Sequence, residues 1–122
     1  MNINEFWKAV LAQDAEKIKL FFNPNAYVNW YCTNEHFTVD EFIRANCEYP
    51  GNWDGTLERV LTVEDTVVTV TRVYPKDKSA SYHVVSFIQV KDGLIVAMDE
   101  YWADDTDAPN WRRNMKIGYK IK

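Results

Sequence analysis

The chain has 122 residues, of which 47% are hydrophobic and 15% aromatic, and its formal net charge is −4. This size predicts a single domain, 1–122, and the negative charge argues against a surface that follows nucleic-acid phosphates. No apolar run is long enough to cross a bilayer, and the start, MNINEFWKAV, lacks the features of a signal peptide.

The two cysteines, Cys32 and Cys47, have neither the spacing of a redox motif nor a secretory context. We therefore expect free thiols in a reducing compartment and a cytoplasmic location. The basic ending, WRRNMKIGYKIK, is interpreted as a solvated terminal segment.

The first third of the chain is predicted to be helical. Apolar residues recur at helical spacing from Ile3 to Leu11, with Asn2 or Asn4 available as a cap. Asp14 begins a second short helix, which Pro24 is expected to end.

A strand, a helix and a loop are expected next. The segment AYVNWYC, 26–32, is dense in β-branched and aromatic residues, which favours a strand. Thr38 and Glu41 form a capping box ahead of a third helix, and His36 is placed in the loop before it. The Pro and Gly of EYPGNWDG predict another loop, which contains Trp53.

After Gly55 the sequence predicts only strands, 57–63, 66–74, 81–90 and 94–102, joined by the short turns ED, PKDK and KDG. Consecutive hairpins form an antiparallel meander, and helices precede it. The expected fold class is therefore α+β, with helices on one face of the sheet.

The register of the last hairpin decides which of two neighbouring acids, Asp99 and Glu100, points inward. A three-residue turn closed by Gly93 would pair Val90 with Leu94 and continue to Tyr82 with Trp102. One face of this ribbon is then almost wholly apolar, and Glu100 is its only charge. The face contains Tyr82, Val84, Ser86, Ile88, Val90, Leu94, Val96, Met98, Glu100 and Trp102. We predict that Glu100 points inward and Asp99 outward.

An ionised carboxylate among apolar side chains is costly unless it is paired or solvated. Three states of Glu100 are open: an ion pair with Arg72 or Arg59, a protonated acid with a raised pKa, or a group that lines a wet pocket.

The order of these elements, closing with KDGLIVAMDEYW, resembles the SnoaL-like branch of the nuclear transport factor 2-like superfamily. The resemblance runs from FWKAVLAQDAEKIKLFF to EYWADDTDAPNWR, and its last parts resemble a bacterial subgroup whose members mostly lack an assigned activity. It implies a cone in which a strongly bent antiparallel sheet wraps around the N-terminal helices and leaves a deep pocket at the open end.

The resemblance also implies site residues. Family members line the pocket with the positions that are Met98, Glu100 and Trp102 here, and polyketide cyclases hold their acid/base aspartate where this chain has Glu100. The cyclase histidine is replaced by Met98. Steroid isomerases need a tyrosine and an aspartate where this chain has Phe6 and Trp30, so that chemistry is not expected.

The predicted pocket is apolar and aromatic, with Glu100 as its inward acid. Its candidate ligand-binding residues are Phe6, Trp30, Trp53, Tyr82, Met98 and Trp102. The first hypothesis is a protein that binds a small hydrophobic molecule. The second is a cyclase, isomerase or lyase that uses Glu100 as general acid/base.

No cofactor and no metal are expected. The two histidines give no metal triad, and the acidic run DDTD, 104–107, is interpreted as a solvated turn.

The opposite face of the sheet is predicted to mediate assembly. Its apolar residues are Val85, Phe87, Ile95, Ala97 and Tyr101. An exposed apolar patch of that size usually marks an interface, so we expect a homodimer, with neither nucleic acid nor membrane as a partner.

Overall fold

The computed structural model describes residues 1–121 and contains four α-helices, one short 3₁₀ helix and six strands. In chain order these are α1 (Ile3–Leu11), α2 (Ala15–Leu20), β1 (Phe22–Trp30), η1 (Tyr31–Thr33), β2 (Glu35–Thr38), α3 (Val39–Cys47), β3 (Trp53–Val63), β4 (Thr66–Pro75), β5 (Tyr82–Lys91), β6 (Leu94–Asp104) and α4 (Asn110–Asn114).

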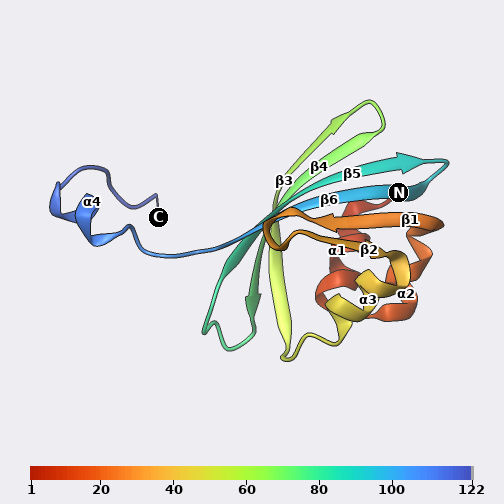
Figure 1. Ribbon diagram of the computed structural model, residues 1–122, viewed down its shortest axis with the longest axis horizontal. Coiled ribbons are helices and arrows are strands. Elements are labelled where there is room, and N and C mark those ends of the chain that lie inside the picture. Colours follow the sequence, from red (N-terminus) through yellow and green to blue (C-terminus); the bar gives the residue numbers. More distant parts are fainter. Residues whose placement is uncertain (122) are drawn as a thin grey trace.

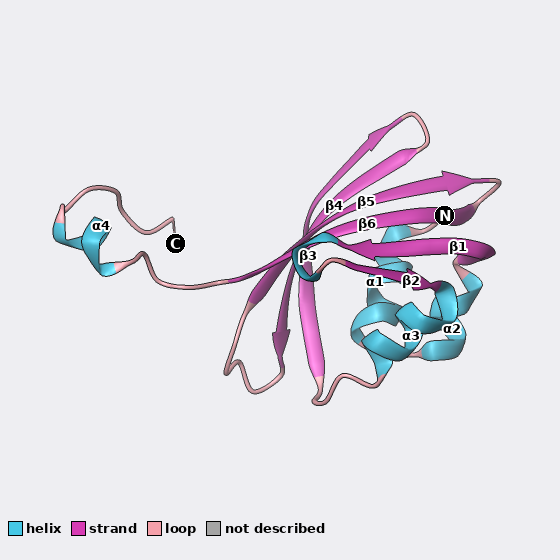
Figure 2. Ribbon diagram, in the orientation of Figure 1, coloured by secondary structure: helices cyan, strands magenta, loops and turns pink. Residues whose placement is uncertain are grey.

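All six strands form one sheet in the order β2-β1-β6-β5-β4-β3. The sheet is strongly bent and unclosed, and α1, α2 and α3 lie together on one side of it (Figure 1). The α+β class with N-terminal helices is confirmed. One pairing differs from the antiparallel expectation, because β1 runs parallel to β6. Figure 2 shows the C-terminal segment with α4 extending away from the sheet.

The predicted helix starts are present as capped ends. The side chain of Asn2 accepts a hydrogen bond from the Glu5 amide, and Asp14 does the same for Lys17. At α3 the capping box is complete, with Thr38 and Glu41 satisfying each other's backbone amides.

Pro24 does not end the second helix, as the sequence suggested, because α2 already stops at Leu20. Pro24 instead lies inside β1, where the pairing with β6 shifts between Phe22 and Tyr27. A residue without an amide hydrogen is tolerated at such an irregularity.

The sequence does not predict β2, and it predicts a loop at Trp53. The segment Glu35–Thr38 pairs antiparallel with β1, so His36 lies in a strand, and Trp53 begins β3 opposite Pro75. Four mostly polar residues carry little strand pattern, which is why an edge strand of this length escapes notice.

The predicted register of the last hairpin is wrong, although the predicted side of Glu100 is right. The turn has two central residues, Asp92 and Gly93, both with positive φ, and Lys91 pairs with Leu94. A bulge at Val96 then adds one residue to β6. The shorter turn and the bulge each shift the pairing of β6 with β5 by one residue, in the same direction. The total shift is two residues, which preserves the alternation of side chains, so Glu100 beyond the bulge remains on the inner face.

Between the turn and the bulge, the residues of β6 lie on the opposite faces from those predicted. Ile95, expected on the outer face, is fully buried in the core, while Leu94 and Val96 are only half-buried. Beyond the bulge Glu100 is 2% exposed and lies directly opposite Ser86, whereas Asp99 is half-buried and lies opposite Phe87.

The core fills the space between the helices and the inner face of the sheet. Phe6, on α1, is fully buried and makes edge-to-face ring contacts with Trp7, Phe21 and Phe22. These contacts fix α1 against the start of β1, and α1 in turn forms one wall of the site described next.

Candidate functional site

A cavity of about 300 Å³ lies where α1 and α3 meet one end of the sheet. Its lining comes from α1, α3, η1 and the strands β1, β3, β4, β5 and β6. The lining residues are Trp7, Val10, Leu11, Gln13, Trp30, Cys32, Thr33, Ala45, Asn46, Tyr49, Trp53, Val73, Tyr82, Trp102 and Asp104. Since these residues are far apart in sequence, the cavity is a product of the tertiary fold.

Aromatic rings dominate the cavity wall. The Trp53 ring packs against Tyr49 at 5.3 Å and against Tyr82 at 6.0 Å between centroids. Trp30 and Trp102 meet edge to face at 6.3 Å. Such contacts hold the rings in place without a ligand.

The structure brings together four of the residues proposed from the sequence, since Trp30, Trp53, Tyr82 and Trp102 all line the cavity. The other three proposed residues are not among the lining residues. Phe6 is 0% exposed and Met98 is 1% exposed, and both belong to the hydrophobic core. The third is Glu100.

Glu100 lies behind the aromatic wall of the cavity. The Trp30 indole Nε1–H donates to Glu100 Oε1 at 3.0 Å, and the Ser86 hydroxyl donates to Oε2 at 2.5 Å. Burial raises the pKa of the Glu100 carboxyl above its usual value, and these two hydrogen bonds oppose the rise. Glu100 is thus held by neutral donors.

An ion pair with Arg72 or Arg59 is not formed within residues 1–121. Arg72 lies opposite His83 across the β4–β5 pairing, and its guanidinium stands 4.7 Å from the Tyr74 ring centroid. Trp102 also lowers the Glu100 pKa, but its Nε1 makes no hydrogen bond in the described chain. The hydrogen-bond donors to the carboxyl are Ser86 and Trp30.

The helical side of the cavity is not among the residues predicted from the sequence. Gln13 follows α1 with φ 54°, and its Nε2 donates to the carbonyl oxygens of Asn46 and Tyr49 at 2.9 and 2.8 Å. Asn46 Nδ2 donates to the Val10 carbonyl at 3.0 Å. These bonds tie α1 to α3. Trp7 could have been suspected, because it adjoins Phe6 on the same apolar stripe.

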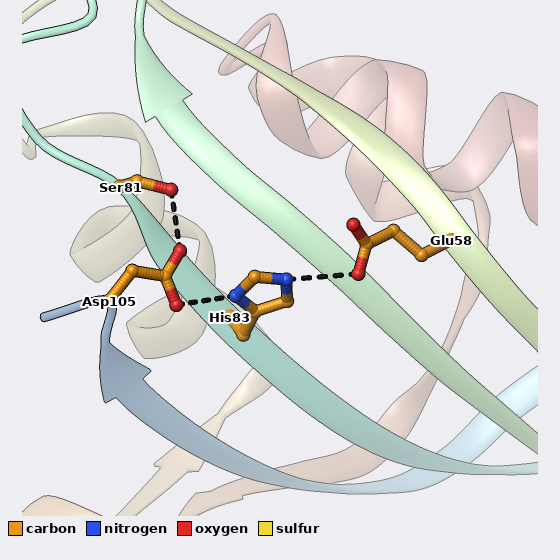
Figure 3. Close-up of polar contacts among 4 residues, drawn as sticks. All are labelled: Glu58, Ser81, His83 and Asp105. Atoms are coloured by element: carbon orange, nitrogen blue, oxygen red, sulfur yellow. Dashed lines mark hydrogen bonds and ion pairs between the residues drawn. The ribbon is translucent and has the colours of Figure 1, made fainter. Parts of the chain in front are cut away.

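A second polar cluster lies on the sheet, separate from the cavity. His83 on β5 stands between two carboxylates, with Nδ1 2.5 Å from Asp105 Oδ1 and Nε2 2.9 Å from Glu58 Oε1 (Figure 3). Glu58 occupies the extra position of a bulge in β3, between Leu57 and Arg59, and its side chain reaches across β4.

The interpretation of DDTD as a solvated turn holds only in part. All four residues are exposed, but Asp104 ends β6 and Asp105 also accepts from the Ser81 hydroxyl at 2.5 Å. The hydrogen bond to Asp105 is the main reason that the pKa of His83 is raised, and Glu58 adds to it. Burial acts to raise the pKa of Asp105, but Ser81 and His83 outweigh it and the net shift is downward.

The arrangement is not that of an activated serine. Ser81 bonds to the aspartate and not to the imidazole, whereas a nucleophilic serine must give its proton to the histidine. Both ring nitrogens face carboxylates, so the cluster favours a protonated His83.

No helix within residues 1–121 is long and apolar enough to cross a membrane. No group of three or more His, Cys, Asp or Glu side chains there could hold a metal ion.

Similar solved structures share the fold at low sequence identity. A candidate ketosteroid isomerase from Kribbella flavida DSM 17836 has a TM-score of 0.81 and 19% identity, with 98% of this chain and 88% of that chain covered. A nuclear transport factor 2-like protein of unknown function from Burkholderia xenovorans LB400 has a TM-score of 0.79 and 18% identity, covering 98% and 92%.

An epoxide hydrolase of Mycobacterium tuberculosis has a TM-score of 0.67 and 12% identity, covering 83% of this chain and 79% of that one. The fold is therefore nuclear transport factor 2-like. None of the curated proteins matches the sequence.

Residues 3–98 match the SnoaL-like domain family, and the chain belongs to that family. The resemblance inferred from the sequence is confirmed. Proteins of this fold are named for different reactions, so the fold alone does not define an activity.

Proposed function

We propose that this SnoaL-like protein binds a small, largely apolar molecule in the aromatic cavity. The observation that carries the proposal is the cavity wall, to which four tryptophans and two tyrosines contribute from six different elements and loops. A volume of about 300 Å³ is at the lower end of small-molecule sites, which span roughly 300–1,000 Å³. The ligand is therefore expected to be small.

The second hypothesis from the sequence was an enzyme that uses Glu100 as general acid/base. Such a residue must come within hydrogen-bond reach of the substrate. Glu100 does not line the cavity, and Trp30, which does, donates to it. An acid/base role would require the Trp30 ring to swing aside, so the geometry supports binding over catalysis by Glu100.

A cavity-filling variant tests the binding function. Ala45, on α3, lines the cavity, so Ala45→Phe should occupy part of it, whereas Ala108→Phe changes an exposed residue beyond β6. Thermal-shift and native mass-spectrometry screens of small apolar molecules should give ligands that bind the wild type and Ala108→Phe but not Ala45→Phe. Equal binding by all three proteins would place the ligand elsewhere.

Cysteine alkylation gives an independent readout. Cys32 is exposed and lines the cavity, whereas Cys47 does not line it. In a Cys47→Ser variant, a bound ligand should slow the reaction of Cys32 with iodoacetamide. In a Cys32→Ser variant, the same ligand should leave the rate of alkylation at Cys47 unchanged.

We also propose that the protein forms a homodimer through the outer face of the sheet. Phe87 and Tyr101 are 41% and 42% exposed there, and Tyr31 stacks on Tyr101 with 4.9 Å between ring centroids. The predicted patch is smaller than expected, because Ile95 faces the core and Ala97 is also buried. Exposed aromatic rings grouped in this way support an interface.

A further inference from the structure

The indole N–H groups of the cavity are directed away from a ligand. Trp7 Nε1 donates to Thr69 Oγ1 at 3.2 Å, Trp30 Nε1 to Glu100 at 3.0 Å, and Trp53 Nε1 to the Pro50 carbonyl at 3.1 Å. The Trp102 Nε1 is buried from solvent. Three of the four indole donors are thus engaged by acceptors of the protein and the fourth is buried, so the rings offer the cavity mainly carbon and π surface.

The two side-chain amides at the cavity, like the indoles, donate their N–H groups to acceptors of the protein. The amino group of Gln13 is used by two backbone carbonyls, and that of Asn46 donates to a third. Because only the nitrogen of an amide can donate, these partners fix which atom is which. The carbonyl oxygens of Gln13 and Asn46 accept no hydrogen bond within residues 1–121 and remain as acceptors.

The only formal charge among the described lining residues is negative. Asp104, at the end of β6, contributes a carboxylate, and no Lys, Arg or His lines the cavity. The hydroxyls of Thr33, Tyr49 and Tyr82 can either donate or accept. An anionic ligand would find no opposite charge in this lining, whereas a cation would find a carboxylate, amide oxygens and π surface.

We propose that the cavity ligand is an organic ammonium ion with small alkyl substituents. This rests on the proposed binding function and names its ligand class. Alkyl groups satisfy the aromatic wall, and the positive charge is attracted by the ring faces and by Asp104. Attraction of a cation to aromatic ring faces is how proteins commonly recognise quaternary ammonium groups.

A pair of probes with the same shape isolates the charge. Choline and 3,3-dimethylbutan-1-ol differ in the replacement of the quaternary nitrogen by carbon, so an apolar cavity would prefer the alcohol. The proposed cavity should bind choline about tenfold more tightly, which corresponds to about 1.4 kcal/mol. Titration calorimetry and tryptophan fluorescence would measure both dissociation constants.

A matched pair of variants locates the charge effect. Asp104→Asn should weaken choline binding several-fold and leave binding of the neutral alcohol unchanged. Asp107→Asn removes an equal charge from a residue outside the lining, so it should alter neither affinity. Equal losses in both variants would mean general attraction to an acidic protein and would overturn the proposal.

The outcomes separate this inference from the binding function. If the alcohol binds as tightly as choline, the cavity selects neutral molecules, so the inference fails and the binding function stands. The inference also fails, and the binding function also stands, if neither probe binds but another small apolar molecule binds the wild type and not Ala45→Phe. If no molecule binds in the cavity, both fail.

Discussion

Glu100 illustrates how a buried acid can serve structure without an ion pair. Its two hydrogen bonds come from a neutral indole on β1 and a neutral hydroxyl on β5, so it links three neighbouring strands below the cavity. Because burial raises its pKa, the neutral acid is the form that folding favours.

The first prediction compares Glu100→Gln with Glu100→Ala. A glutamine has the shape of the neutral acid and can still accept from Trp30, so it should change the free energy of unfolding little at acidic pH. Glu100→Ala removes the side chain and leaves Trp30 and Ser86 without a partner, which should destabilise the fold by about 2–4 kcal/mol. Urea denaturation of both variants would measure the difference.

The pH dependence of the same pair tests the sign of the shift. The folded-state pKa of Glu100 lies above its unfolded value, about 4.3 for a free glutamate. Its stabilising contribution is therefore complete below that value and is lost as the pH rises through the folded pKa. Wild type should lose stability relative to Glu100→Gln over this range. If the free energies of unfolding of the two proteins, plotted against pH, gave parallel curves, a raised pKa of Glu100 would be contradicted.

The second prediction concerns His83, whose pKa is raised mainly by Asp105 and less by Glu58. NMR titration of the ring should show Asp105→Asn lowering the pKa more than Glu58→Gln. The stabilising effect of the cluster should be complete below about pH 6.5, the pKa of histidine in the unfolded chain. It should be lost as the pH rises through the pKa of His83 in the folded protein. A larger effect of Glu58→Gln would contradict the geometry of Figure 3.

At the scale of elements, the helices were predictable because their signals are local. Each of the first three begins at a capping side chain named from the sequence, and the Thr38–Glu41 box is reproduced in full. The paired strands of the meander were predictable for the same reason, since short turns separate dense apolar runs.

The register of the last hairpin was not predictable in the same way. Lys91–Leu94 accommodates either a two- or a three-residue turn, and the choice depends on the whole sheet. The bulge at Val96 and the core position of Ile95 depend on long-range packing. The prediction for Glu100 succeeded because two one-residue shifts preserve the alternation.

The cavity was predictable only in part. Its strand residues, such as Trp30 and Trp102, follow from alternation on a bent sheet. Its helical wall does not, because Gln13 acts through hydrogen bonds to residues more than thirty positions away, Asn46 and Tyr49. No local pattern encodes such a contact.

The third prediction concerns the contact between α1 and β3. A Cβ placed on Gly55 would lie 2.6 Å from the Arg72 carbonyl oxygen and 3.1 Å from two methyl carbons of Leu11. Gly55→Ala should therefore destabilise the protein by about 1–3 kcal/mol, as overpacking commonly does. Thr56→Ala, at the next and exposed position, should change stability by less than about 0.5 kcal/mol. Chemical denaturation of both variants would test this, and equal effects would contradict it.

At the scale of the molecule, the bent sheet separates two surfaces of different character. Its inner face, with α1 and α3, encloses the aromatic cavity, and its outer face presents the Phe87 and Tyr101 rings. Edge-to-face packing of these two rings, at 6.1 Å, leaves both in place on the surface. An interface on the outer face would therefore not occupy the cavity on the inner face.

The fourth prediction tests the proposed dimer. Phe87→Glu should yield monomers in sedimentation at micromolar concentration, because a two-fold interface places the new charge close to its own copy in the partner subunit. Leu20→Glu is the matched control, since Leu20 is 76% exposed on α2 and should leave the assembly unchanged. A wild type that sediments as a monomer would refute the interface. Phe87→Glu should still bind the cavity ligand, because Phe87 does not line the cavity.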